Sequence, residues 1–313
     1  MPTPLGSKRE ESGERPTSGS PNFHHGFFYL IGCGPNGPQT ATLQALETIQ
    51  RMDAVLAPAR QARLFADYIG DTPVAFDPWA GFWDYQGKPF NTLTPEETEL
   101  FRQNRTGLLE QRMEEIRAML DKGLDVGLLE FGNPCLFGPG QSYAERLRPQ
   151  EVIIIPGMGA DAAAMAAVGA SILPAHQARF LLQTAPFMLT GQGLSPDMSL
   201  EEPSPEAQEF LSLLAKQQHS AIFYMALTDA PRLFEMLGRD LPGDLPCAAV
   251  YWAGDPERQR VVRGVLEDMP AKLKDDPERF MGLLLAGRFL EGQPFTTAHD
   301  RSPAMAEATQ KKN

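Results

Sequence analysis

The chain has 313 residues, of which 42% are hydrophobic and 22% are charged, and its formal net charge is −12. This composition is typical of a globular protein. The acidic balance argues against nucleic acid or an anionic membrane surface as a partner, because phosphate contacts need clustered Lys and Arg. No apolar run of about 18 residues and no apolar leader is present, so we expect a cytoplasmic protein that neither spans a membrane nor is secreted.

The three cysteines, Cys33, Cys135 and Cys247, are far apart in the sequence. None belongs to a Cys-x-x-Cys pair, which is the usual signature of a cysteine metal site. We therefore expect three reduced thiols and no bound metal.

The two ends of the chain are rich in Pro, Gly, Ser and charged residues. They contain too few apolar residues to offset the entropy lost on ordering, so residues 1–26 and 296–313 are predicted to be disordered tails. Between them we expect two α/β domains, an N-terminal one over 27–180 and a C-terminal one over 181–295.

The N-terminal domain begins with an apolar run at 27–31 that predicts a buried strand. A glycine-rich corner of the form Gly-x-Gly-Pro follows and contains Gly34 and Pro35. Residues 40–52 have helical spacing, and 53–58 predict a second strand. Such a corner between a strand and a helix exposes backbone N–H groups to a ligand, although it lacks the Gly-x-Gly-x-x-Gly dinucleotide pattern.

The same pattern of strand, corner and helix occurs twice more. A helix with apolar residues at 109, 113, 116 and 120 ends at Lys122-Gly123, and 125–131 predict a strand that ends on Gly132-Asn133-Pro134. The continuous apolar run 152–155 precedes a Pro-Gly corner and an Ala-rich helix. These units predict an open α/β sheet, covered on both faces, with its ligand site at the carboxyl ends of the strands.

The C-terminal domain is predicted from less regular signals. Strands are expected at 179–184, 220–227 and 245–254, and helices at 230–238 and 257–269. An apolar segment at 282–290 completes the domain. Residues 193–206 are polar and rich in proline, which predicts a loop.

At this point the sequence resembles the tetrapyrrole (corrin/porphyrin) methylase family over about residues 27–291. The resemblance is carried by six blocks in the family's order: "FYLIGCGPNGPQTATLQALETIQRMDAVL", "FGNPCLFG", "VIIIPGMGADAAAMAAVGA", "IFYMAL", "LPCAAVYWAGDPERQRVVRGVLEDM" and "GLLLAGRFL". The family implies a methyltransferase that uses S-adenosyl-L-methionine, held in a cleft between two α/β domains. It also implies a homodimer.

The resemblance further implies which residues contact the cofactor. The family's Gly-Asp-Pro loop corresponds to Gly132-Asn133-Pro134, and its small residue near the adenine corresponds to Ala248. A glycine there lets the backbone approach a ligand, and a proline fixes the turn. The complete expected set is Gly34, Pro35, Gly132, Asn133, Pro134, Phe137, Gly157, Ala160, Asp161, Met225 and Ala248.

The sequence departs from the family pattern at its first corner. The family has Gly-x-Gly-Pro-Gly-Asp-Pro, whereas Asn36 and Gly37 here replace the second Gly and the Asp. That Asp faces the substrate in tetrapyrrole enzymes, so its absence leaves the substrate open. Asn133 also replaces the Asp of the second corner, which removes one negative charge near the cationic sulfonium.

A second resemblance, to the borosin-type peptide backbone N-methyltransferases, offers another substrate. It is carried by "YQGKP" at 85–89, by Arg105 and by "EFGNPCLF". It implies a separate peptide chain as substrate, with Tyr85 and Arg105 as the catalytic residues. Tyr85 would orient or deprotonate the substrate, and Arg105 would bind a carboxylate or an amide oxygen. A third alternative is a non-catalytic cofactor-binding protein of the same fold.

The segment before the long helix holds the remaining candidates for substrate contact. Trp79, Phe82, Trp83 and Tyr85 would form either a wall for a flat or peptidic substrate or a small satellite core. A carboxylate-rich tetrapyrrole would also need a local basic patch. The basic residues expected near the cleft are Arg60, Arg63, Lys88, Arg102 and Arg105.

Overall fold

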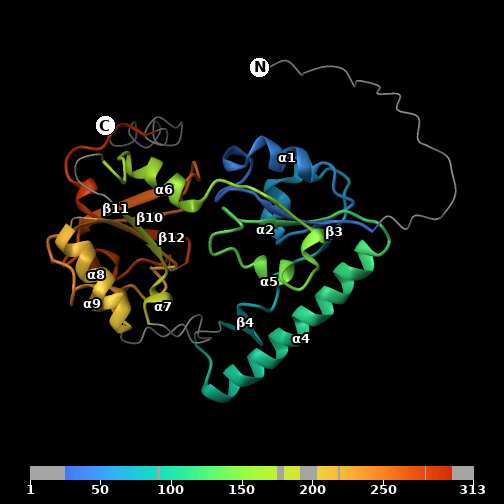
Figure 1. The fold of residues 1–313 in the computed structure, drawn as a ribbon, viewed down its shortest axis with the longest axis horizontal. Coiled ribbons are helices and arrows are strands. Elements are labelled where there is room, and N and C mark those ends of the chain that lie inside the picture. Colours follow the sequence, from blue (N-terminus) through green and yellow to red (C-terminus); the bar gives the residue numbers. More distant parts are fainter. Residues whose placement is uncertain are drawn as a thin grey trace.

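A computed structural model describes residues 25–89, 92–174, 180–190, 203–217, 219–278 and 280–297. These residues form two lobes that lie side by side along the longest axis of the molecule (Figure 1). Each lobe is built on a five-stranded sheet, which confirms the predicted α/β fold with two α/β units. The predicted tails lie almost entirely outside the described residues, and the limit between 180 and 181 stays a prediction.

The sheet of the first lobe is entirely parallel. Its strand order is β3-β2-β6-β1-β7, with Phe28 of β1 paired to Val126 on one side and to Val152 on the other. This confirms the strands that were predicted from continuous apolar runs. Their bounds are β1 (Phe28–Gly32), β2 (Ala54–Leu56), β3 (Val74–Phe76), β6 (Val126–Glu130) and β7 (Val152–Ile155).

Both faces of the central strands β1, β2 and β6 are buried, as the apolar runs predict, whereas Ile154 of the edge strand β7 is 44% exposed, so the predicted cover on both faces is wrong for 152–155. Successive residues of a strand point to opposite faces, so Leu30 and Leu128 belong to one core while Ile31 and Leu129 belong to the other. The helices of the lobe cover these two faces. They are α1 (Leu43–Ile49), α2 (Ala59–Leu64), α3 (Ala66–Ile69), α4 (Pro95–Leu120) and α5 (Gln141–Ala144).

The long helix α4 runs along the outside of the first lobe (Figure 1). It begins at a capping box in which Thr94 accepts from the Glu97 N–H and the Glu97 carboxylate accepts from the Thr94 N–H. It ends just before Lys122-Gly123, where Gly123 has φ +81°, as the sequence predicts. A short hairpin, β4 (Asp84–Tyr85) and β5 (Lys88–Pro89), precedes it.

The sheet of the second lobe is mixed, with the order β11-β10-β12-β9-β8. Only the β8–β9 pair is parallel. Helix α6 follows the first sheet in sequence but packs on β10, β11 and β12 of the second. The elements are α6 (Ala160–Val168), β8 (Leu181–Thr184), α7 (Pro186–Leu189), α8 (Pro205–Gln217), β9 (Ser220–Tyr224), α9 (Ala230–Leu237), β10 (Pro246–Tyr251), β11 (Arg260–Val265), α10 (Met269–Leu273) and β12 (Gly282–Ala286).

The predicted helix at 257–269 is wrong, because Arg260–Val265 form the edge strand β11. β11 pairs antiparallel with β10, with Ala248 opposite Arg263. Its valines favour a strand, and the apolar spacing also fitted a helix, which is the usual ambiguity of a short apolar segment. Helix α8 was not predicted. Most of the predicted loop at 193–206 lies outside the described residues, and its end belongs to α8.

Candidate functional site

The three predicted glycine corners of the first lobe meet at the carboxyl edge of its sheet. Gly34 and Gly132 form an isolated β-bridge in which the Gly132 N–H donates to the Gly34 carbonyl oxygen at 3.0 Å. Gly157 packs against the same backbone, because a Cβ atom placed on it would lie 2.2 Å from the Gly132 carbonyl oxygen. The sheet order places β1 between β6 and β7, and this brings the corners together.

Backbone leaves no room for a side chain at Gly34 or Gly157. A Cβ atom on Gly34, whose φ is +68°, would lie 2.1 Å from the Thr40 carbonyl oxygen. Gly132 also has a positive φ of +72°, but a Cβ atom there would find its nearest neighbour, the Ala160 nitrogen, only at 3.8 Å. The space beside Gly132 is therefore open, as expected where backbone approaches a ligand.

The loop after β6 is held from within by local hydrogen bonds. The Asn133 side-chain oxygen accepts from the Cys135 N–H at 3.0 Å, and Gln141 donates to the Pro134 carbonyl oxygen at 3.2 Å. Beneath the loop, the buried Glu130 carboxylate accepts from the Gly140 N–H at 2.7 Å. Burial raises the pKa of Glu130 to about 7. Asn133 thus supports the turn with its own side chain.

The second lobe contacts this loop through Phe137. The Phe137 ring, on a residue with φ +56°, lies 4.8 Å from the ring of Tyr224 at the end of β9. The next residue, Met225, has φ +53° and packs on the same second-lobe core as Phe137 and Ala160. The loop, the start of α6 and the end of β9 therefore share one neighbourhood.

Two polar groups in this neighbourhood were not predicted. The Gln183 amide of β8 approaches the Asp161 carboxylate at 3.5 Å. The Tyr224 hydroxyl is buried and makes no hydrogen bond to a described residue. Burial raises the pKa of Tyr224, and the nearby Asp161 carboxylate raises it further. A buried hydroxyl without a partner indicates that a ligand or water completes this site.

Two of the predicted cofactor residues, Pro35 and Ala248, are buried against or within the second lobe. Pro35 is buried and faces Gly254 of the second lobe, where a Cβ atom would lie 3.9 Å from the proline ring. Ala248 is fully buried in β10 and pairs with Leu285 of β12. β12 separates β10 from β9, so Ala248 lies inside the sheet and its cofactor role stays a prediction.

The predicted catalytic residues lie in a separate cluster beside α4. Tyr85 packs on Phe101, with ring centroids 6.4 Å apart. The Arg105 guanidinium lies 5.3 Å from the centre of the Phe82 ring and 5.7 Å from that of Trp83. Within the described residues, Tyr85 and Arg105 make no hydrogen bond to each other. Their joint catalytic role therefore stays a prediction.

The aromatic segment forms the satellite core that the sequence left as one alternative. Trp79 and Phe82 pack edge to face with centroids 5.9 Å apart, and Tyr143 packs on both. Arg112 and the Tyr143 hydroxyl both donate to the Pro78 carbonyl oxygen, at 2.8 and 2.6 Å. Trp83 differs, because it is exposed and lies 6.3 Å from Phe280 of the second lobe.

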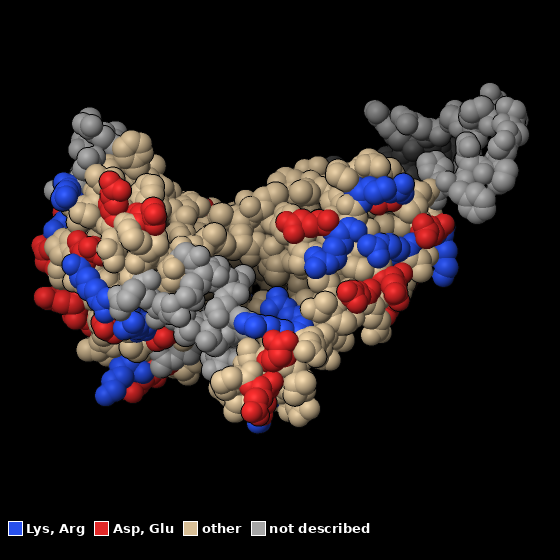
Figure 2. All heavy atoms as spheres, turned by 60° about the horizontal axis from the view of Figure 1, so that its bottom comes forward, with Lys and Arg blue, Asp and Glu red and all other residues tan. Residues whose placement is uncertain are grey.

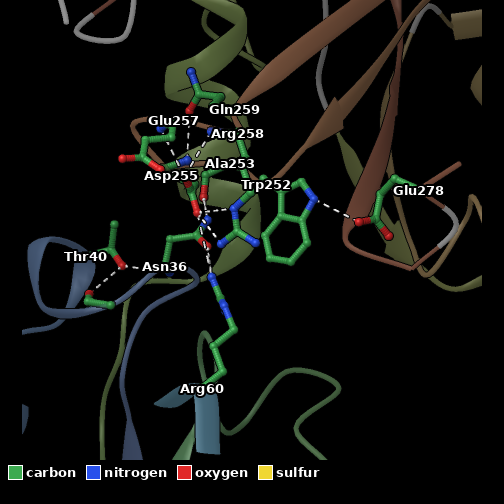
Figure 3. Close-up of polar contacts among 12 residues, drawn as sticks. Asn36, Thr40, Arg60, Trp252, Ala253, Asp255, Glu257, Arg258, Gln259 and Glu278 are labelled. Carbon is green, nitrogen blue, oxygen red and sulfur yellow. Dashed lines mark hydrogen bonds and ion pairs between the residues drawn. The ribbon is translucent and has the colours of Figure 1, made fainter. Parts of the chain in front are cut away.

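A network of polar side chains joins the lobes beside the first corner (Figure 3). The Asn36 side-chain amide donates to the Ala253 carbonyl oxygen at 2.5 Å and accepts from Arg60 at 3.2 Å. Arg60 lies 3.7 Å from the Asp255 carboxylate. We call Asn36, Arg60, Trp252, Ala253 and Asp255 the inter-lobe junction. Asn36, which replaces a family glycine, thus makes a contact between residues far apart in sequence.

The remaining predicted basic residues are not all directed at the junction. Lys88 pairs with Glu97, and Arg102 pairs with Glu99 at 3.5 Å on the surface of α4. Arg63 lies near enough to Arg60 to lower its pKa, after the larger effect of burial. Within the part of the chain that the structure describes, Arg60 is the only one of the five with an ion pair or a ring contact to the second lobe.

Other kinds of site receive no support from the described part of the chain. No group of three or more His, Cys, Asp or Glu side chains there has the arrangement of a metal site. None of the helices described is both long and apolar enough to cross a bilayer. A shallow hollow of about 360 Å³ lies between α9 and α10, away from the corners.

Two α/β lobes that meet at glycine corners define a ligand-binding α/β protein with its site at the strand carboxyl ends. Residues 28–270 match the family described as tetrapyrrole (corrin/porphyrin) methylases. The chain belongs to this family, which confirms the resemblance found in the sequence.

Curated relatives extend this comparison. The chain is 23% identical over 272 residues to the siroheme synthase of Nitrosomonas europaea, which covers 86% of this chain and 50% of that protein. It is 28% identical over 256 residues to the uroporphyrinogen-III C-methyltransferase of Paracoccus denitrificans, covering 79% and 76%. The chain thus spans about half the length of the siroheme synthases that it matches.

Solved structures share the fold. A cobalt precorrin-4 methyltransferase superposes with a TM-score of 0.65 at 20% identity, covering 87% of this chain and 99% of that one. The uroporphyrin-III C-methyltransferase of Thermus thermophilus, solved with S-adenosylhomocysteine, superposes with a TM-score of 0.56 at 20% identity, covering 85% and 99%. These likenesses support the two-lobed architecture.

Proposed function

We propose that this protein is an S-adenosyl-L-methionine-dependent methyltransferase that acts on a tetrapyrrole-like substrate. The observation that carries the proposal is the convergence of three glycine corners with Phe137, Asp161 and Met225 at the place where the lobes meet. Membership of the tetrapyrrole methylases supports the same activity. The relatives named as methyltransferases support it further.

The residues present fit such a cofactor. The open space beside Gly132 leaves room for a ligand against the backbone, and the buried Tyr224 hydroxyl lacks a partner among the described residues. Gly132, Asn133 and Gly157 would hold it through main-chain groups, and Phe137 and Met225 would cover its apolar part. The Asp161 carboxylate offers an acceptor for a cationic or hydroxyl group.

The bound cofactor would supply a methyl group on a positively charged sulfur. Transfer by in-line displacement needs alignment and exclusion of water more than proton transfer, because the departing thioether takes no proton. The rigid corners fix the position of the backbone, and the packing of Phe137 on Tyr224 excludes water from one side. This explains why the site contains few reactive side chains.

The peptide alternative receives less support from the geometry. It depends on Tyr85 and Arg105 acting together, whereas Tyr85 packs on Phe101 and Arg105 lies over Phe82 and Trp83. We further propose a homodimer in the cytoplasm, on the basis of the family resemblance. The free cysteines, with Cys33 and Cys247 buried, are in keeping with that location.

Calorimetry with S-adenosylhomocysteine tests the cofactor site. We expect the unmodified chain to bind, and Met225→Ala to bind about 10-fold more weakly, since a ligand that covers the partly buried Met225 side chain would gain about 1.5 kcal/mol from it. Met188→Ala is the matched control, because Met188 is 53% exposed on α7. Failure of the unmodified chain to bind at millimolar ligand would overturn the proposal.

Turnover tests the substrate class. Transfer of a labelled methyl group to uroporphyrinogen III or to precorrin extracts is compared with transfer to peptides encoded by neighbouring genes. Label on the tetrapyrrole supports the proposal. Label on a peptide amide would support the backbone N-methyltransferase instead. Cofactor binding without transfer to either would point to a non-catalytic protein of the same fold.

A further inference from the structure

Arg60 lies at the inter-lobe junction in surroundings unusual for a surface arginine. Its guanidinium lies 4.9 Å from the centre of the Trp252 ring of the second lobe and 5.5 Å from that of Phe131 at the end of β6. Asn36 accepts one of its hydrogen bonds, and the side chain is 28% exposed. Arg60 is therefore held in place by both lobes while part of it stays accessible (Figure 3).

The positive charge of Arg60 is only weakly compensated. Asp255 is engaged by Arg258, whose Nε and Nη2 donate to it at 2.9 and 2.5 Å, and by two backbone N–H groups. Arg60 remains 3.7 Å away, beyond hydrogen-bond distance. Burial lowers the pKa of Arg60, and the charges of Arg258 and Arg63 lower it further. Two arginines, Arg258 and Arg60, thus approach one carboxylate in a protein of net charge −12.

Arg105 repeats this arrangement on α4. It is half-buried over Phe82 and Trp83, and burial lowers its pKa. Within the described residues, no carboxylate forms an ion pair with it. Its neighbour Arg102, three residues earlier, is exposed and paired with Glu99. Figure 2 shows Lys and Arg side chains gathered where α4 approaches the second lobe.

One segment of the second lobe links the two arginine sites. The Trp252 indole donates to the Glu278 carboxylate at 2.8 Å, and the Trp252 N–H donates to the Met281 carbonyl oxygen at 3.0 Å. Phe280, between them in sequence, lies 6.3 Å from Trp83. Trp252, next to Arg60, and Trp83, next to Arg105, therefore both lie beside the short segment that contains Glu278, Phe280 and Met281, on the side where the lobes meet.

We propose that Arg60 at the inter-lobe junction and Arg105 on α4 bind two carboxylates of one flat, polyanionic substrate. A planar guanidinium can donate two parallel hydrogen bonds to a carboxylate, and stacking on an indole fixes its plane. A tetrapyrrole carries carboxylates around its rim, whereas a peptide backbone amide carries no such charges. The inference rests on the proposed function and assigns its substrate class to particular residues.

Binding of uroporphyrin III, the stable oxidised carboxylate-bearing macrocycle, tests the inference. It is titrated by fluorescence quenching in the presence of S-adenosylhomocysteine. Arg60→Gln and Arg105→Gln are each expected to weaken binding about 10- to 100-fold, the range for a charged hydrogen bond, and added salt should weaken the unmodified protein's binding. Arg102→Gln is the matched control and should bind as the unmodified protein does.

The readouts separate this inference from the proposed function. S-adenosylhomocysteine affinity and the melting temperature are measured for every variant. Arg60→Lys keeps the charge but lacks the planar guanidinium, so its affinity for uroporphyrin III should lie between that of the unmodified protein and that of Arg60→Gln. Equal uroporphyrin affinity in all variants would overturn the inference while cofactor binding keeps the proposed function. Loss of cofactor binding in the unmodified chain would overturn the function itself. If Arg60→Gln fails to fold, Arg105→Gln and the salt dependence decide.

Discussion

The glycine corners and the inter-lobe junction adjoin each other, but the corners are formed by main-chain atoms and the junction by side chains. At the corners, main-chain atoms of Gly34, Gly132 and Gly157 lie against one another, and backbone leaves no room for a side chain at Gly34 or Gly157. At the junction, side chains of Asn36 and Arg60 cross to the second lobe. A cofactor site made of main-chain atoms therefore tolerates changes in the neighbouring side chains, and those side chains can determine which substrate binds beside the cofactor.

The largest effect is expected from a side chain placed in the corners. Gly157→Ala puts a methyl group 2.2 Å from the Gly132 carbonyl oxygen, so the backbone must shift. We expect a loss of about 3 kcal/mol in the free energy of unfolding and loss of S-adenosylhomocysteine binding. Chemical denaturation and calorimetry check this.

The matched control is Gly107→Ala in α4, where a Cβ atom meets nothing within 4 Å. It should stabilise the protein by about 0.5–1 kcal/mol, because alanine favours a helix interior. Unchanged stability and cofactor binding in Gly157→Ala would show that the corners are not closely packed.

A second prediction concerns the carboxylate under the corner loop. Glu130 is buried, and this burial raises its pKa to about 7, above the ordinary glutamate value of 4.5. The folded state therefore holds the proton more tightly than the unfolded state. The resulting stability is fully present below about pH 4.5 and is lost as pH rises to about 7.

The pH dependence is measured by comparing Glu130→Gln with the unmodified protein. Between pH 5 and pH 8 the unmodified protein should lose about 2 kcal/mol more than the variant, since one pKa unit corresponds to about 1.4 kcal/mol. The amide oxygen of glutamine can still accept from the Gly140 N–H. Parallel pH profiles for the two proteins would contradict the prediction.

A third prediction separates the junction from the corners. Asn36→Gly restores the family residue but leaves the Ala253 carbonyl oxygen and one Arg60 hydrogen bond without their partner. We expect a loss of about 1–2 kcal/mol in stability, with S-adenosylhomocysteine affinity unchanged. If cofactor affinity fell as far as stability, the two regions would act as one site.

The first lobe could be predicted well because its signals are local. Parallel strands buried on both faces appear as continuous apolar runs, and each corner is marked by glycine where a positive φ or a close approach demands it. The second lobe offered weaker signals. The valines of Arg260–Val265 fit a helix as well as an edge strand, and only pairing with β10 decides between them.

The site was predictable where it is made of backbone and not where it is made of distant side chains. The Asn36–Ala253 contact joins residues 217 positions apart, and no local pattern in a single sequence predicts such a contact. One signal was present but not used. The predicted strand at 245–254 ends at Gly254, which begins a Gly254-Asp255-Pro256 turn and has φ +85°. That turn carries the Asp255 that Arg60 and Arg258 approach.

The smallest effect is expected one residue from the junction. Gln61 is fully buried, and neither its amide nitrogen nor its amide oxygen has a hydrogen-bond partner among the described residues. A buried amide without partners costs about 1–3 kcal/mol, so Gln61→Met, similar in shape, should raise the free energy of unfolding by about 1 kcal/mol. Gln141→Met is the matched control and should lower it, because Gln141 donates to the Pro134 carbonyl oxygen. Denaturation curves for both variants check this. Destabilisation by Gln61→Met would mean that a bound water makes hydrogen bonds to the Gln61 amide. The environment of the residue next to Arg60 would then be polar, like the junction itself.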